Sequence, residues 1–246
     1  MAMKNIKLEI SYDGTNFCGF QIQPELRTVQ GELQRSLSII SQSKITINAS
    51  GRTDTGVHAR KQVCNFLTEL DIPSYKWAEV LNPLLPDDIV ILNSSEVPLD
   101  FHSRYHVKRK TYRYAVHHNK TLDVFRRNYT WFYPYPLDIT RMQEASQLFL
   151  GEHDFTAFSS IKASVKSKIR IISSSEVWQE GNEIYFQVTG NGFLYNMVRI
   201  MMGTLISCSR NKITPTELID LFSTKERGKA GTTAPAKGLT LWDVEY

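Results

Sequence analysis

Residues 6–12 read Ile6-Lys-Leu-Glu-Ile-Ser-Tyr12, an alternation of apolar and polar side chains. Successive side chains of a β-strand point to opposite faces, so this stretch predicts a strand with one buried face. Further along the chain, Val29, Leu33, Leu37 and Ile40 recur at helical spacing. The chain is therefore expected to begin with a strand followed by a helix that packs on its apolar face.

The remainder of the first hundred residues continues this arrangement. We expect strands at 45–49, 62–68 and 89–92 and a helix at 77–85. Ser74 is the expected N-cap of that helix, and Pro83 is expected to kink or shorten it. The order β-α-β-β-α-β is typical of a sheet with its helices on one face.

The second half also alternates strand and helix patterns. We expect strands at 108–116, 170–178, 183–189 and 239–246 and helices at 138–150, 193–207 and from 214. Gly181-Asn182 predicts a hairpin, and the capping box Thr214-Pro-Thr-Glu217 predicts a helix start. These patterns predict an α+β fold with two α/β domains, 1–104 and 105–246, each with a mainly antiparallel sheet and helices on one face.

Composition excludes several classes of protein. The chain has 246 residues, of which 41% are hydrophobic and 22% charged, as in globular proteins and unlike disordered or fibrous ones. It contains no uninterrupted apolar run of the roughly 18 residues that a bilayer span needs, and no signal-peptide pattern. Its three scattered cysteines, Cys18, Cys64 and Cys208, suit a reducing compartment, so we expect a cytoplasmic protein.

Positive charge is concentrated in residues 102–127, which we call the basic band. The chain carries +4, but the band holds eight Lys/Arg and only one acid, Asp123, so it carries +7 and the remainder −3. A band of this kind is typical of polyanion binding, although a solvated basic face is the alternative. A second basic stretch, Lys162–Arg170, is either an RNA contact or a surface loop.

Two residues stand out chemically. Arg199 is the only formal charge in the apolar helix expected at 193–207, so we expect it mid-helix and paired with a carboxylate, rather than extended towards water. The best candidate for this carboxylate is Asp54, in the segment Gly51-Arg-Thr-Asp-Thr-Gly-Val-His-Ala59. The segment is a dense set of polar residues, and the alternative interpretation is a plain turn. No metal-ligand spacing and no nucleotide-binding motif is found, so neither metal nor cofactor is expected.

The sequence resembles the bacterial tRNA pseudouridine synthase A family over nearly its whole length. The core of the resemblance is Gly51–Ala59. Supporting blocks are Tyr12–Gln21, Thr28–Glu32, Phe101–Arg104, Lys110–Tyr114, Gly151–Phe155, Gly192–Arg199 and Ala234–Leu239. Members of this family are isomerases that convert uridine to pseudouridine at positions 38, 39 and 40 of the tRNA anticodon stem-loop, without cofactor or metal.

The resemblance also implies roles for individual residues. Asp54 matches the catalytic aspartate, Arg199 its arginine partner, Tyr112 the tyrosine that packs on the target base, and Arg52 the residue that helps to flip the uridine out or fills its place. Arg104 and Lys110 of the basic band are expected to bind the substrate. The resemblance further implies a homodimer of two-domain subunits with a basic active-site cleft between the domains.

Three alternatives from other classes remain. One is an RNA-binding module without activity, which predicts loss of the Asp54 or Arg199 residue type. A second is a glycosidase-like hydrolase, which needs two carboxylates where this segment offers one. A third is a buried Asp–Arg pair with only a structural role. Whether Asp54 attacks C1′ or C6 or removes a proton is left open by the sequence.

Overall fold

The chain divides into two compact units. The computed structural model describes residues 2–160 and 167–246, so residues 162–166 of the second basic stretch Lys162–Arg170 lie outside the described residues. The first unit comprises Met1–Lys108 with Leu241–Tyr246, and the second comprises Arg109–Thr240. No described helix has the length and apolar character that a bilayer span requires.

The first unit is a sheet with two α-helices. Its elements are β1 (Lys4–Tyr12), the 3₁₀ turn η1 (Gly14–Asn16), α1 (Val29–Ser41), β2 (Asn48–Ala49), β3 (His58–Thr68), the 3₁₀ turn η2 (Ser74–Lys76), α2 (Trp77–Leu81), the 3₁₀ turn η3 (Asn82–Leu84), β4 (Ile89–Val97) and most of β10 (Leu239–Glu245). Its strands are ordered β4-β1-β3-β10, and β1 pairs antiparallel with both β3 and β4. The expected order β-α-β-β-α-β is confirmed.

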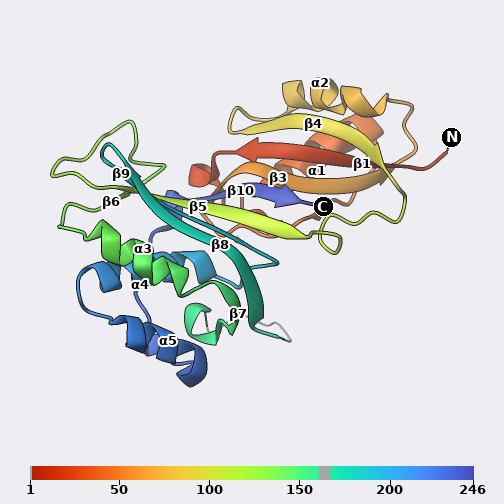
Figure 1. Ribbon diagram of the computed structural model, residues 1–246. Coiled ribbons are helices and arrows are strands. Elements are labelled where there is room, and N and C mark those ends of the chain that lie inside the picture. Colours follow the sequence, from red (N-terminus) through yellow and green to blue (C-terminus); the bar gives the residue numbers. More distant parts are fainter. Residues whose placement is uncertain (1, 161–166) are drawn as a thin grey trace. The chain divides into compact units, whose positions relative to one another are not determined.

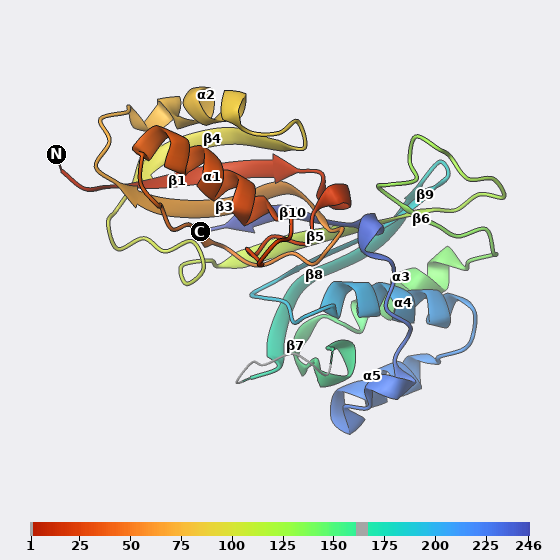
Figure 2. The ribbon, with the colours of Figure 1, turned by 180° about the vertical axis from the view of Figure 1, so that it is seen from behind.

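The alternation in β1 builds the core of this unit. Ile6, Leu8 and Ile10 are fully buried, and the neighbouring strand places Phe66 opposite Ile6 and Cys64 opposite Leu8. Helices α1 and α2 cover this face, with α1 in front of the strands in Figure 2. Burial of apolar side chains at a period of two therefore selects the register of β1, because a slip by one residue would expose all of them.

Two expectations for this unit are wrong in detail. The strand expected at 45–49 is only the two residues of β2, because Ile45 and Ile47 are buried without joining the ladder. Ser74 is not the N-cap of a helix; it opens a 3₁₀ turn that follows Pro73 and has no side-chain cap. The predicted effect of Pro83 is confirmed, since α2 ends at Leu81 and a 3₁₀ turn replaces the next helical turn.

The second unit is also a sheet with helices. Its elements are β5 (Arg109–His117), β6 (Trp131–Phe132), α3 (Ile139–Gln147), β7 (Gly151–Asp154), the 3₁₀ turn η4 (Thr156–Phe158), β8 (Ile169–Glu180), β9 (Glu183–Gly190), α4 (Met197–Ser209), α5 (Pro215–Thr224) and the 3₁₀ turns η5 (Arg227–Lys229) and η6 (Ala236–Gly238). The strand order is β5-β9-β8-β7, with antiparallel neighbours throughout this path. Helix α3 packs on β8 and on α4, and α4 also contacts β5 (Figure 1). The expected α+β class with mainly antiparallel pairing is confirmed, and β6 is the exception because it pairs parallel with β5.

Local signals in this unit are confirmed except at the start of α4. The hairpin β8–β9 turns at Gly181-Asn182, and Thr214 and Glu217 form the full capping box of α5. Helix α4, expected at 193–207, instead begins at Met197. Residues before it form a turn, because Asn196 adopts a left-handed conformation with φ of 62° and the Met197 amide bonds the Leu194 carbonyl. As expected, α4 is buried on nearly all sides.

Candidate active site

The segment that carries Asp54 is a short loop of the first unit between β2 and β3. Asp54 is half-buried, Arg52 is exposed and Thr53 is buried. The Val57 amide donates to the Asp54 carbonyl at 3.1 Å, which closes the loop into a turn. Asp54 is thus only partly buried, while its backbone carbonyl is held in the turn.

A second segment, residues 13–20 after β1, is hydrogen-bonded to this loop. The Phe20 amide donates to the Thr53 carbonyl at 3.1 Å, and the Gly14 amide donates to Nδ1 of buried His58 at 3.0 Å. A side chain at Gly14 has no room, since its Cβ would lie 2.1 Å from the Val57 carbonyl oxygen. The two backbones are therefore in direct contact.

Buried polar side chains of the sheet also form hydrogen bonds to the loop. Tyr12 Oη and Thr53 Oγ1 share a hydrogen bond of 2.7 Å, next to Asp54 in the chain. Gln62 Nε2 donates to the Gly51 carbonyl at 2.9 Å, and the Ser50 hydroxyl bonds the Gln62 side-chain oxygen. Burial raises the pKa of Tyr12 well above its ordinary value, so its hydroxyl stays neutral. The loop ends are thereby fixed by side chains that the sequence analysis did not single out.

Tyr112 lies on β5 of the second unit, opposite Val188 of β9. Only 8% of Tyr112 is exposed. Its ring contacts the ring of Phe193 edge to face, with the two ring centres 5.0 Å apart. Such an arrangement orients an aromatic ring with little freedom. Phe193, which the sequence analysis did not assign to the site, thus helps to fix the plane of the Tyr112 ring.

Arg199 lies in the first turn of α4, so the expected mid-helix position is wrong. The reason is the late start of the helix at Met197, and Arg199 is half-buried rather than enclosed. Its Nε donates to the Ala234 carbonyl at 2.7 Å and its Nη1 to Asn196 Oδ1 at 2.8 Å. Its pairing with Asp54 stays a prediction, because the two residues belong to different units.

The basic band is not uniformly available to an anion. Arg126 forms a two-bond ion pair with Glu183, at 2.6 and 2.7 Å. Desolvation raises the pKa of Glu183, but hydrogen bonds from Arg126 and Tyr185 outweigh it, and the pKa falls below its ordinary value. Glu183 is therefore ionised and offsets one charge of the band. Exposed basic residues of the band are Arg104, Lys108, Arg109, Lys120 and Arg127, while Lys110 is half-buried.

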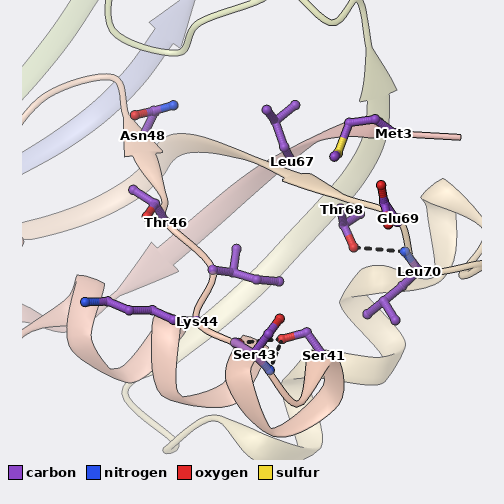
Figure 3. A pocket seen from close by; sticks show the side chains of 11 residues that line it. Met3, Ser41, Ser43, Lys44, Thr46, Asn48, Leu67, Thr68, Glu69 and Leu70 are labelled. Atoms are coloured by element: carbon purple, nitrogen blue, oxygen red, sulfur yellow. Dashed lines mark hydrogen bonds between the residues drawn. The ribbon is translucent and has the colours of Figure 1, made fainter. Parts of the chain in front are cut away.

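A pocket of about 670 Å³ lies elsewhere on the first unit (Figure 3). Met3, Leu67 and Leu70 supply apolar surface there, and Lys44 and Glu69 supply charge. None of the residues expected at the site lines this pocket. Among the residues that the structure describes, no group of three or more His, Cys, Asp or Glu could hold a metal ion.

The sequence matches the family model described as tRNA pseudouridine synthase over residues 10–106 and 145–246. The chain belongs to the tRNA pseudouridine synthase family. The expected resemblance is therefore confirmed. Members of this family are isomerases that convert uridine to pseudouridine in tRNA.

Curated relatives named tRNA pseudouridine synthase A match this chain over nearly its full length. The tRNA pseudouridine synthase A of Anoxybacillus flavithermus is 49% identical over 99% of this chain and 99% of its own length. That of Brevibacillus brevis is 48% identical over 99% of this chain and 100% of its own. That of Halalkalibacterium halodurans is 50% identical over 96% of this chain and 90% of its own length.

One solved structure that the chain matches is much less similar. The crystal structure of a Cbf5-Nop10-Gar1 complex matches with a TM-score of 0.34 and 13% identity, over 82% of this chain and 54% of that chain. The assignment to the tRNA pseudouridine synthase family therefore comes from the sequence matches.

Proposed function

We propose that this enzyme isomerises uridine to pseudouridine at positions 38, 39 and 40 of the tRNA anticodon stem-loop, with Asp54 as the catalytic carboxylate. The observation that carries the proposal is the Asp54 loop. Asp54 is half-buried, so part of the residue is exposed, while hydrogen bonds from Tyr12, Phe20 and Gln62 hold its neighbours. A catalytic group needs this combination of access and fixed geometry.

The reaction breaks the N1–C1′ bond of uridine and joins C1′ to C5. The hydrogen on C5 leaves to solvent, and N1 gains a proton. A stacked base cannot present these atoms, so the uridine must be flipped out at a cost of a few kcal/mol. Arg52, exposed beside Asp54, is the proposed residue for this step. Asp54 then acts on C1′, on C6 or as a base.

The second unit supplies the other proposed groups. Tyr112 would pack on the flipped base, which is worth about 1–3 kcal/mol per stacked base. Arg199 would pair with Asp54, because the planar guanidinium can present two parallel N–H donors to a carboxylate. Arg104, Lys110 and the exposed cations of the basic band would contact the tRNA backbone. The proposed assembly is a cytoplasmic homodimer.

Tritium release from tRNA labelled at C5 of uridine tests the assignment of Asp54. Only rearrangement at C5 releases the label, so a binding protein or a hydrolase gives none. Asp54→Asn should abolish release and keep the affinity for tRNA, while Asp71→Asn, whose side chain is 83% exposed, should leave both unchanged. Turnover by Asp54→Asn at the wild-type rate would exclude Asp54 as the catalytic group.

The target positions and the assembly are tested separately. Substrates that keep a single uridine at position 38, 39 or 40 should each release label, and a tRNA without uridine at these positions should release none. Release from that last substrate would contradict the proposed sites. Analytical ultracentrifugation should give about twice the mass of the 28.3 kDa chain; a monomer that is active at the same concentration would contradict the homodimer.

A further inference from the structure

Helix α4 crosses the segment 231–234 of the second unit in backbone contact. A Cβ at Gly203 would lie 1.8 Å from the Thr232 carbonyl oxygen, and one at Gly231 would lie 2.3 Å from the Gly203 carbonyl carbon. The Gly231 amide also donates to Thr204 Oγ1 at 3.0 Å. Only glycine leaves room for this contact at residues 203 and 231, so the close backbone contact fixes the position of the segment along the axis of α4.

Three residues further along, the same segment holds Arg199 by two hydrogen bonds. The buried Ala234 donates its amide to the Arg199 carbonyl at 3.2 Å and accepts from Arg199 Nε at 2.7 Å. The first bond fixes Ala234 against the start of α4, and the second fixes the direction of the guanidinium. The Ala234 carbonyl, together with Asn196 Oδ1, which accepts from Nη1 at 2.8 Å, therefore helps to set where the guanidinium of Arg199 points.

Tyr114 of β5 holds the next peptide of this segment. Its hydroxyl donates to the Pro235 carbonyl at 2.7 Å, and its side chain is fully buried. A Cβ at Gly238 would lie 2.6 Å from ring atoms of Tyr114, so the segment wraps closely around the ring. Burial raises the pKa of Tyr114 far above its ordinary value, and the hydroxyl stays a neutral donor.

We infer that Tyr114 is a positioning residue: through the Pro235 and Ala234 carbonyls it fixes the direction of the Arg199 guanidinium. The inference rests on the proposed role of Arg199. Tyr114 lies two residues from Tyr112 on the same face of β5. One strand therefore orients the base-packing ring directly and the arginine through the segment 234–235.

A double-mutant cycle on tritium release tests this role. Tyr114→Phe keeps the ring and removes the hydroxyl, so kcat should fall about tenfold with an unchanged KM. Lysine has no Nε donor for the Ala234 carbonyl, so Tyr114→Phe should cause no further loss in an Arg199→Lys background. The matched control is Tyr133→Phe, which removes a buried hydroxyl bonded to Arg210 and should leave kcat unchanged.

The outcomes separate the inference from the proposed function. An unchanged kcat for Tyr114→Phe, or an equal loss in both backgrounds, would overturn the positioning role while leaving the role of Arg199 intact. Full turnover by Arg199→Lys would overturn the proposed role of Arg199 and the inference with it. If the Arg199→Lys background is too slow to measure, a crystal structure of Tyr114→Phe decides. A displaced guanidinium supports the inference, and an unmoved one overturns it.

Discussion

Replacement of Gly14 by alanine should separate the geometry of the Asp54 loop from its chemistry. Gly14 begins η1, and the added Cβ would lie 2.1 Å from the Val57 carbonyl oxygen, whereas real Cβ atoms essentially never come within 3.0 Å. The loop and η1 must therefore move apart by about 0.9 Å, the difference between these two distances. The added atom meets backbone, so no side-chain rotation can relieve the contact.

The effect on turnover follows from this displacement. A shift of about 1 Å at a catalytic group costs about 100-fold in rate. Overpacking of this kind also destabilises a fold by about 1–3 kcal/mol, which lowers the melting temperature by about 2–4 °C per kcal/mol for a chain of this size. We expect Gly14→Ala to be folded at assay temperature and to release tritium about 100-fold more slowly.

Gly228→Ala is the matched control. A Cβ at Gly228 meets no atom within 4 Å, so this variant should keep wild-type turnover and stability. Both variants are assayed under single-turnover conditions well below their melting temperatures, with folding checked by circular dichroism. Wild-type release by Gly14→Ala would refute the reasoning, since it would mean that the position of the loop does not control the rate.

Three further predictions concern stability and binding. Thr214→Ala removes the N-cap of α5, which bonds the Glu217 amide at 3.2 Å, and should cost about 1 kcal/mol in thermal unfolding, whereas Thr216→Ala on the exposed side should cost little. Desolvation raises the pKa of Asp154, but hydrogen bonds from Lys225 and Thr156 outweigh it and lower the pKa below its ordinary value. Asp154 therefore stabilises the fold above about pH 4, and this contribution is lost as pH falls through the lowered pKa. Asp154→Asn should reduce the melting temperature at pH 7 by an amount worth at most about 1 kcal/mol and change it less at pH 3; an equal reduction at both would contradict this. Affinity for tRNA should fall steeply with salt. Lys120→Ala should lower the magnitude of the slope of log affinity against log salt by about 1, whereas Lys76→Ala, outside the basic band, should not change it. Equal slopes for the wild type and both variants would count against the band as an RNA contact.

Local patterns in the sequence were sufficient for much of the fold. The alternation of residues 6–12, the hairpin at Gly181-Asn182 and the capping box at Thr214 are confirmed because each depends on neighbours within a few residues. The motif Gly51–Ala59 was likewise sufficient to indicate the family. The roles of Asp54, Tyr112 and Arg199 come from that motif and its companions, and they stay predictions.

Contacts between distant residues decided the rest. Arg126 meets Glu183, 57 residues away, so a cation counted in the basic band is neutralised by a strand that the band does not contain. Gly14 and Gly203 look like ordinary turn and helix glycines, but each lies against a backbone from another segment. Most strands, the capping box of α5 and the family follow from the sequence alone, because these depend on local periodicity and on a contiguous motif. Which charges are offset and which backbone carbonyl holds Arg199 depend instead on close packing between segments far apart in the chain, so they required the three-dimensional structure.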